Sequence, residues 1–192
     1  MSAFTFIFSG IHISNTRSRH EDTDFAACAL RVDGVDQGTK TKALGNLNNG
    51  DHGISNGADG GPAFGPMELA DNAKVEFSYS VVNHGHDDMG ANAASAAANA
   101  AITQAGPDGS NGEALKALFN TLIGFVFANC DGGVVAGKRE WIVSDLKQLF
   151  GNSNRLDLTG QHNGYDSDTG CGSNSDYRSH LIILKDISPP AS

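Results

Sequence analysis

A stretch of helix-type sequence interrupts a chain that otherwise alternates like β-structure, and this interruption limits the fold more than any other feature. Alanine, the best helix former, fills much of 93–101, and the Gly and Pro residues of 106–112 break the pattern. A second segment, 113–128, is apolar nearly all round and must be covered. We therefore expect a helical hairpin, residues 84–131, inserted between strands.

The segments on both sides of this insert alternate between apolar and polar residues, as half-buried strands do. In the clearest case, 73–82, the inward set is Val75, Phe77, Tyr79 and Val81, and the solvent-facing set is Lys74, Glu76, Ser78 and Ser80. Further strands are predicted at 4–13 with a bend at Gly10, at 25–32, at 37–44 as an edge strand, at 134–143, and at 177–187 in a central position. Ser144 and Asp145 are expected to cap a short helix that ends at Phe150.

Short strands separated by turn-rich stretches favour antiparallel sheets. We predict a mainly β fold, an antiparallel two-layer β-sandwich with the helical hairpin packed against one face or end. An α+β fold, in which one sheet is covered by two helices, is the alternative. The 192 residues contain no repeat of fixed period and no interior linker, so a single domain, 1–192, is expected.

Charge and hydropathy exclude several classes of protein. The net charge is −9, and only 13 Lys and Arg residues are present, scattered along the chain, so nucleic acid is not an expected partner. No apolar run approaches the roughly 18 residues that a membrane-spanning helix needs. Residues 1–8 lack the basic start and the cleavage site of a secretory signal, which leaves the localisation open.

Two long polar stretches, 45–65 and 151–176, are predicted to be loops, and the second contains Asp-x-Asp-x-Gly at 166–170. Carboxylates and amides at alternate positions suit Ca²⁺, which takes about six to eight oxygen ligands. If the strands bring the loops to one end, the ligands would be Asp22, Asp24, Asp51, Asn163, Asp166, Asp168 and Asp176. An ordinary cluster of Asx turns is the alternative interpretation.

Two histidines stand where a strand meets the insert, in the order His84-Gly85-His86-Asp87-Asp88. Imidazoles two apart at a strand end can point to the same side and hold zinc. Residues 75–91 resemble the strand-to-helix turn of the metallo-β-lactamase superfamily, whose pattern is His-x-His-x-Asp-His, and the resemblance implies a metal-dependent hydrolase with His84 and His86 as ligands. Met89 replaces the last histidine of that pattern. A helix start with N-capping aspartates is therefore favoured, and zinc is not expected.

The three cysteines differ in their surroundings. Cys28 lies on the inward face of the strand at 25–32, where it is expected to be a small buried thiol. Cys130 and Cys171 both lie in Gly-flanked loops, and a disulfide between them would stabilise the fold by about 3.5–4 kcal/mol on the entropic model. Such a bridge would indicate an extracellular final location.

These features favour a non-enzymatic recognition module whose polar loops, ordered by Ca²⁺, bind carbohydrate or another cell-surface ligand. The expected ligand contacts are Tyr165, Asn174 and Trp141. The alternative is a membrane-active protein, pore-forming or lipid-binding, whose hairpin at 89–128 leaves the sheet and inserts in a bilayer interface. A metal-dependent hydrolase at His84 and His86 is the weaker alternative.

Overall fold

The computed structural model describes residues 2–15, 23–84, 87–104, 132–163 and 176–186. The elements, in chain order, are β1 (Ser2–Asn15), β2 (Thr23–Val32), β3 (Val35–Gly45), β4 (Gly50–Gly53), β5 (Ala63–Leu69), β6 (Lys74–His84), α1 (Asp87–Gln104), β7 (Gly132–Ile142), α3 (Val143–Phe150), β8 (Arg155–Asn163) and β9 (Asp176–Asp186). The described chain is mainly β, as predicted.

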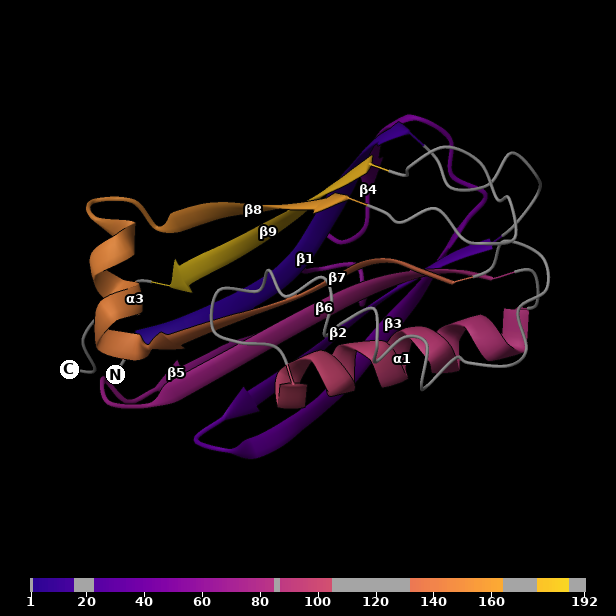
Figure 1. Cartoon of the computed structure of the whole chain (residues 1–192). Coiled ribbons are helices and arrows are strands. Elements are labelled where there is room, and N and C mark those ends of the chain that lie inside the picture. The colour runs from indigo at the N-terminus through magenta and orange to yellow at the C-terminus, as the bar shows by residue number, and fades with distance from the viewer. Residues whose placement is uncertain (1, 16–22, 85–86, 105–131, 164–175, 187–192) are drawn as a thin grey trace.

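The strands form two antiparallel sheets. The larger sheet has five strands in the order β4-β1-β9-β8, with β5 also paired to β1, and the smaller has four in the order β3-β2-β6-β7. The central position predicted for β9 is confirmed, since it lies between β1 and β8, and β3 is the predicted edge strand. Figure 1 shows the two sheets as layers, with α1 across the outer side of the smaller one. Two sheets are present, rather than the single sheet of the alternative fold.

Aromatic side chains join the facing sides of the two sheets. The Phe6 ring on β1 lies 6.0 Å from Phe77 on β6 and 6.3 Å from Trp141 on β7, measured between ring centroids. Phe8 lies 5.1 Å from Tyr79 in the same way. Fully burying one such side chain contributes about 1.5–3 kcal/mol. The sheets therefore share one core, the packing that is typical of a sandwich.

The outer face of β6 differs from the prediction. Glu76, Ser78 and Ser80 were expected to face water, but all three are buried. The cause is α1, which lies on this face: the Ser78 hydroxyl donates to Ala98 O at 2.6 Å and the Ser80 hydroxyl to Ala94 O at 2.7 Å. Because the two serine hydroxyls bond to helix carbonyls, their burial costs little.

The contact between α1 and the smaller sheet is made of small side chains. Its buried residues are Phe25, Ala27, Ala29, Val82, Ala94, Ala97, Ala98 and Ile102. At the end of the helix, Lys138 Nζ donates to Ile102 O at 3.0 Å. The first helix of the predicted hairpin thus packs on one face of a sheet, as expected, and residues 105–131 lie outside the described part of the chain.

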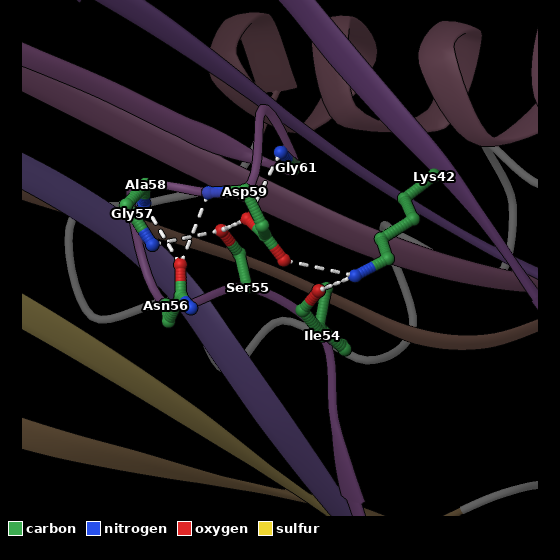
Figure 2. A network of polar contacts seen from close by, with 8 residues as sticks. All are labelled: Lys42, Ile54, Ser55, Asn56, Gly57, Ala58, Asp59 and Gly61. Carbon is green, nitrogen blue, oxygen red and sulfur yellow. Dashed lines mark hydrogen bonds and ion pairs between the residues drawn. The ribbon is translucent and has the colours of Figure 1, made fainter.

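On each long side of the two packed sheets, a basic side chain from the smaller sheet reaches the other layer. Arg139 on β7 donates through Nη2 to Thr159 O on β8 at 3.0 Å. On the opposite side, Lys42 on β3 donates to Ile54 O at 2.6 Å and lies 3.0 Å from Asp59 Oδ2 (Figure 2). The first contact joins two edge strands that share no backbone ladder, and the second joins the edge strand β3 to the turn between β4 and β5.

The turn that receives Lys42 is held by its own side chains. Asp59 accepts hydrogen bonds from Ser55 Oγ at 2.8 Å and from Gly61 N at 3.1 Å, and Asn56 Oδ1 accepts from the backbone N–H groups of Ala58 and Asp59 (Figure 2). Together with Lys42, the Ser55 bond holds the pKa of the Asp59 carboxyl well below its usual range. This network explains how a Gly-rich segment keeps one conformation.

Both stretches predicted as long loops contain strands. β4 and β5 lie within or beside 45–65, and β8 occupies 155–163 of the second stretch. Their polar outward residues concealed them, because β8 alternates between an exposed set and the half-buried Leu156 and Leu158. The short helix α3 begins at Val143 rather than at a Ser144 cap, and its first N–H groups donate to Ala73 O and Asp71 O.

Candidate functional site

Strand ends meet at one end of the two sheets, which we call the loop end. In the smaller sheet, Thr23 is paired with His84, and Asn83 with Gly132. In the larger sheet, Asp176 is paired with both Asn15 and Asn163. Figure 1 shows these strand ends on the same side of the molecule, opposite α3. Antiparallel pairing therefore brings these strand ends together.

A row of polar side chains crosses the larger sheet beside the loop end. Its members are Gln161 on β8, Arg178 on β9, His12 on β1 and Asp51 on β4, each paired with the next in the register of the sheet. Their neighbours along the strands, such as Ile11, Ile13 and Tyr177, point into the core. Because side chains alternate along a strand, this polar row lies on the outer face, the side opposite the core and α1.

The polar row is linked by hydrogen bonds into two groups. His12 Nδ1 lies 2.8 Å from Asp51 Oδ1. Gln161 Nε2 donates to Asp176 Oδ1, and Arg178 Nε donates to Gln161 Oε1 at 3.3 Å. Planar amide, guanidinium and carboxylate groups on one flat surface can bind a ligand rich in hydroxyl or acidic groups, since each offers paired donors or acceptors.

The predicted metal ligands are only partly described. Asp22, Asp166 and Asp168 lie outside the described residues, and Asn163 is the last residue of β8. Asp24 is buried beside Asn83, whose Nδ2 donates to it at 3.3 Å, while Asp51 and Asp176 belong to the outer face of the other sheet. Within the described ranges no three His, Cys, Asp or Glu residues gather around one metal position. The Ca²⁺ site stays a prediction.

The predicted ligand contacts are also divided. Tyr165 and Asn174 lie outside the described residues. Trp141 is half-buried and packs against the core, where it stacks on Phe6 at an interplanar angle of 28° and pairs with Val75 in the register of β6 and β7. The structure therefore does not bring Trp141 together with the polar row.

The cysteines and histidines singled out in the sequence have different outcomes. Cys28 is a buried free thiol, as predicted, and burial raises its pKa well above the usual range. Cys130 and Cys171 lie outside the described residues, so the disulfide stays a prediction. His84 is the last residue of β6, and His86 falls in the gap between β6 and α1.

Sequence reasoning missed a buried polar cluster formed by Tyr79, His162 and Ser179 between the sheets. The His162 Nε2 and Ser179 Oγ atoms lie 2.9 Å apart, and the Ser179 hydroxyl lies 3.2 Å from Tyr79 Oη. Burial and, next, the nearby charge of Arg139 lower the pKa of His162 to about 4. Ser179 is 0% exposed. A hydroxyl without access to a substrate cannot act as a nucleophile, so this cluster is structural.

Two glycines make room for this cluster. A Cβ atom on Gly137 would lie 2.4 Å from Tyr79 Oη, and one on Gly160 would lie 2.8 Å from both Tyr79 Oη and Ser179 Oγ. Real Cβ atoms do not approach other atoms so closely. The sequence signal is faint, since a glycine inside a strand indicates only a bulge or a close approach.

The Gly137→Ala substitution is expected to destabilise the protein by about 1–3 kcal/mol, because the added methyl group overpacks the core against Tyr79. Gly53→Ala is the matched control: Gly53 is also a strand glycine, and a Cβ atom there would meet nothing within 4 Å. Urea unfolding followed by tryptophan fluorescence measures both. Equal stability of the two variants would contradict the close approach.

No protein-family model matches the chain, and no curated protein matches it in sequence. The arguments for function therefore depend on the geometry of the chain itself.

Proposed function

We propose that the protein is a non-enzymatic recognition module, a β-sandwich that binds carbohydrate or another cell-surface ligand at its loop end and along the polar row. The observation that supports this most directly is the row itself, in which four strands place a carboxylate, an imidazole, a guanidinium and an amide in register on one outer face. Side chains on paired strands hold their relative positions, so such a surface is ready for a ligand before the ligand arrives.

The position of the row adds to this argument. The outer face of the smaller sheet is covered by α1. On the larger sheet, by contrast, Gln161 and Arg178 are exposed, and the Asp51 side chain is 86% exposed. The polar groups of this sheet thus lie where a large ligand can reach them, next to the loop end.

A glycan array probed with the purified protein tests this function. We expect binding to a restricted set of glycans, and we expect Gln161→Ala to reduce it at least about tenfold. Gln161 accepts from Arg178 and donates to Asp176, and a lost hydrogen bond in a built site costs about 1.5 kcal/mol. Leu149→Ala is the control, because Leu149 is exposed on α3, far from the polar row. No binding to any glycan would refute the carbohydrate function.

Calcium is the proposed cofactor of this binding. Oxygen ligands from Asp24, Asp51 and Asp176 are already bonded to other side chains of the protein, so the predicted site depends on Asp22, Asp166 and Asp168. We expect chelation by EGTA to lower the melting temperature and added Ca²⁺ to restore it, because an ion that binds only the folded state stabilises that state. Equal melting temperatures with and without Ca²⁺ would remove calcium from the proposal.

Membrane activity is less well supported. It depends on the apolar segment 113–128, which lies outside the described residues, whereas α1 is bonded to the sheet through Ser78, Ser80 and Lys138. None of the described helices is long and apolar enough to span a membrane. Release of dye from liposomes would favour this alternative.

A further inference from the structure

The hydrogen-bonding capacity of the polar row is used unevenly. Two carboxylates, Asp51 in the row and Asp176 beside it, are bonded within the protein. Asp51 is paired with His12, and Asp176 accepts from Gln161. The Gln161 side-chain oxygen accepts from Arg178 Nε at 3.3 Å. The Gln161 oxygen and one oxygen of each carboxylate are therefore engaged within the protein. A ligand must use the groups that remain.

The main hydrogen-bond donor that remains available to a ligand is the guanidinium of Arg178. The side chain is exposed, its hydrogen bond to Gln161 uses only Nε, and the ion pairs of the described residues do not include it. Its two terminal nitrogens form a fork of parallel N–H groups. This fork matches the two oxygens of a carboxylate or a sulfate, to which it donates two hydrogen bonds.

Two further polar side chains adjoin this fork on the outer face. His180 follows Arg178 by two residues on β9, and Thr159 is paired with His180 across β8. Side chains two residues apart on a strand lie about 7 Å from each other, within the span of one sugar unit. Within the described part of the chain, neither the His180 ring nor the Thr159 hydroxyl has a hydrogen bond. Both can therefore donate to the same ligand.

We propose that the ligand of this surface is an acidic saccharide, a glycan that carries a carboxylate or a sulfate, and that Arg178 binds the acidic group while Thr159 and His180 contact the neighbouring hydroxyls. This inference rests on the proposed recognition function and specifies its class of ligand. Neither Arg178 nor Thr159 was singled out from the sequence, where they are 19 positions apart, as the numbering shows.

The charge of the whole protein limits how many acidic groups the ligand carries. At a net charge of −9, a densely charged polyanion or an anionic membrane surface is repelled over a distance of about 10 Å at moderate ionic strength. A ligand with a single carboxylate or sulfate is repelled far less, because it carries one negative group. That group gains two charge-assisted hydrogen bonds from Arg178. The favoured ligand therefore carries isolated acidic groups on an otherwise neutral chain.

Arg155 provides a matched control on the same face of the same sheet. Its Nε lies 2.8 Å from Asp157 Oδ2 and its Nη2 lies 2.6 Å from Asp157 Oδ1, so its fork is occupied by a carboxylate of the protein. The hydrogen bonds that Arg155 donates to Asp157 also raise the pKa of Arg155 above its usual value. Arg155 and Arg178 are both exposed, and they differ in whether the fork is free.

The test compares glycans in matched pairs, sialylated with asialo and sulfated with unsulfated, against the full chain, Arg178→Gln and Arg155→Gln. We expect the acidic member of a pair to bind at least about tenfold more tightly than the neutral member. Arg178→Gln should remove this preference, and Arg155→Gln should keep it. Circular dichroism and melting temperature confirm that both variants fold, and vesicles of phosphatidylcholine with phosphatidylserine are probed in parallel.

Each other outcome overturns the inference in a distinguishable way. Equal binding of acidic and neutral glycans, or equal losses in Arg178→Gln and Arg155→Gln, would refute the acidic saccharide and leave the recognition function standing. Binding to no glycan would refute both. Binding to the phosphatidylserine vesicles alone would replace both with a membrane-directed function.

Discussion

Replacing Lys138 by alanine is expected to destabilise the protein by about 3–5 kcal/mol, because the substitution leaves a buried carboxylate without its partner. Lys138 Nζ lies 2.6 Å from Glu76 Oε1, and the two side chains are only 7% and 10% exposed. The same ammonium lies 3.3 Å from Glu140 and donates to Ile102 O at the end of α1. One ammonium thus contacts two acids and bonds to the end of a helix.

Lys74→Ala is the matched control for this loss. Lys74 contacts the same two acids, at 3.9 Å from Glu76 and 2.8 Å from Glu140, but its side chain is 43% exposed. Water can replace an exposed ammonium, so its removal should change stability far less. Urea unfolding at neutral pH measures both variants, and equal losses would show that burial does not set the strength of the Lys138 contacts.

A double variant separates charge from packing. In Lys138→Met with Glu76→Leu, both buried charges are removed and the apolar volume is kept, so most of the lost stability should return. Hydrogen exchange at 97–102 should nevertheless remain faster than in the unaltered protein, since the bond from Lys138 to Ile102 O is gone. If the double variant is as unstable as Lys138→Ala, the orphaned carboxylate is not the cause.

The inner faces of the strands could be predicted from the sequence, because period-two alternation is a local property. Val75, Phe77, Tyr79 and Val81 all lie in the core as expected. The outer face of β6 could not be predicted in the same way. Ser78 and Ser80 look solvent-facing until α1 covers them, and the helix carbonyls that they contact are 20 and 14 positions away. A polar residue whose hydrogen-bond acceptor is distant in the sequence leaves no local pattern that would predict its burial.

Strand β8 was missed for a related reason. Its outward residues are polar, and its inward positions include Gly160 and His162, which a strand pattern does not require. The glycine is there because Tyr79 occupies the space of its side chain. Because β8 carries Gln161 and Thr159, the failure to predict this strand also left half of the proposed binding surface unpredicted.

The polar row was inaccessible to sequence reasoning altogether. Asp51 and Asp176 were singled out as candidate metal ligands, but their neighbours His12, Gln161 and Arg178 were not. The row exists because β1 lies between β4 and β9, a pairing that joins residues 39 and 166 positions apart, as the register shows. Composition reveals only that such residues are present, and topology decides which of them share a surface.

Acidification from pH 6.5 to pH 4 is expected to remove about 3 kcal/mol of stability through His162 alone. Its pKa in the folded protein is lowered from 6.5 to about 4 by burial and then by Arg139. Since one pKa unit corresponds to about 1.4 kcal/mol, the unfolded chain binds the proton more tightly by about this amount. The stability is complete above about pH 6.5 and is lost as the pH falls towards 4.

The environment of His162 explains why protonation of its imidazole is unfavourable. The imidazole faces the Ser179 hydroxyl on β9, the Tyr79 ring on β6 at 5.9 Å between centroids, and the charge of Arg139 on β7. It forms no ion pair with a carboxylate within the described ranges. A charged imidazole would therefore lose hydration and gain a like-charged neighbour, which are the two conditions that lower a histidine pKa.

The variant His162→Gln isolates this contribution from the titration of the carboxylates. Glutamine can keep a hydrogen bond to Ser179 and does not titrate, so its stability should fall less steeply between pH 6.5 and 4 than that of the unaltered protein. Leu149→Ala is the control, because it changes an exposed side chain and removes no titratable group, and its curve should run parallel to the unaltered one. Parallel curves for His162→Gln would mean that the buried imidazole is not the acid-sensitive group. A flatter curve would locate the acid sensitivity of the fold at the seam between β7 and β8, where Arg139 already reaches across to Thr159.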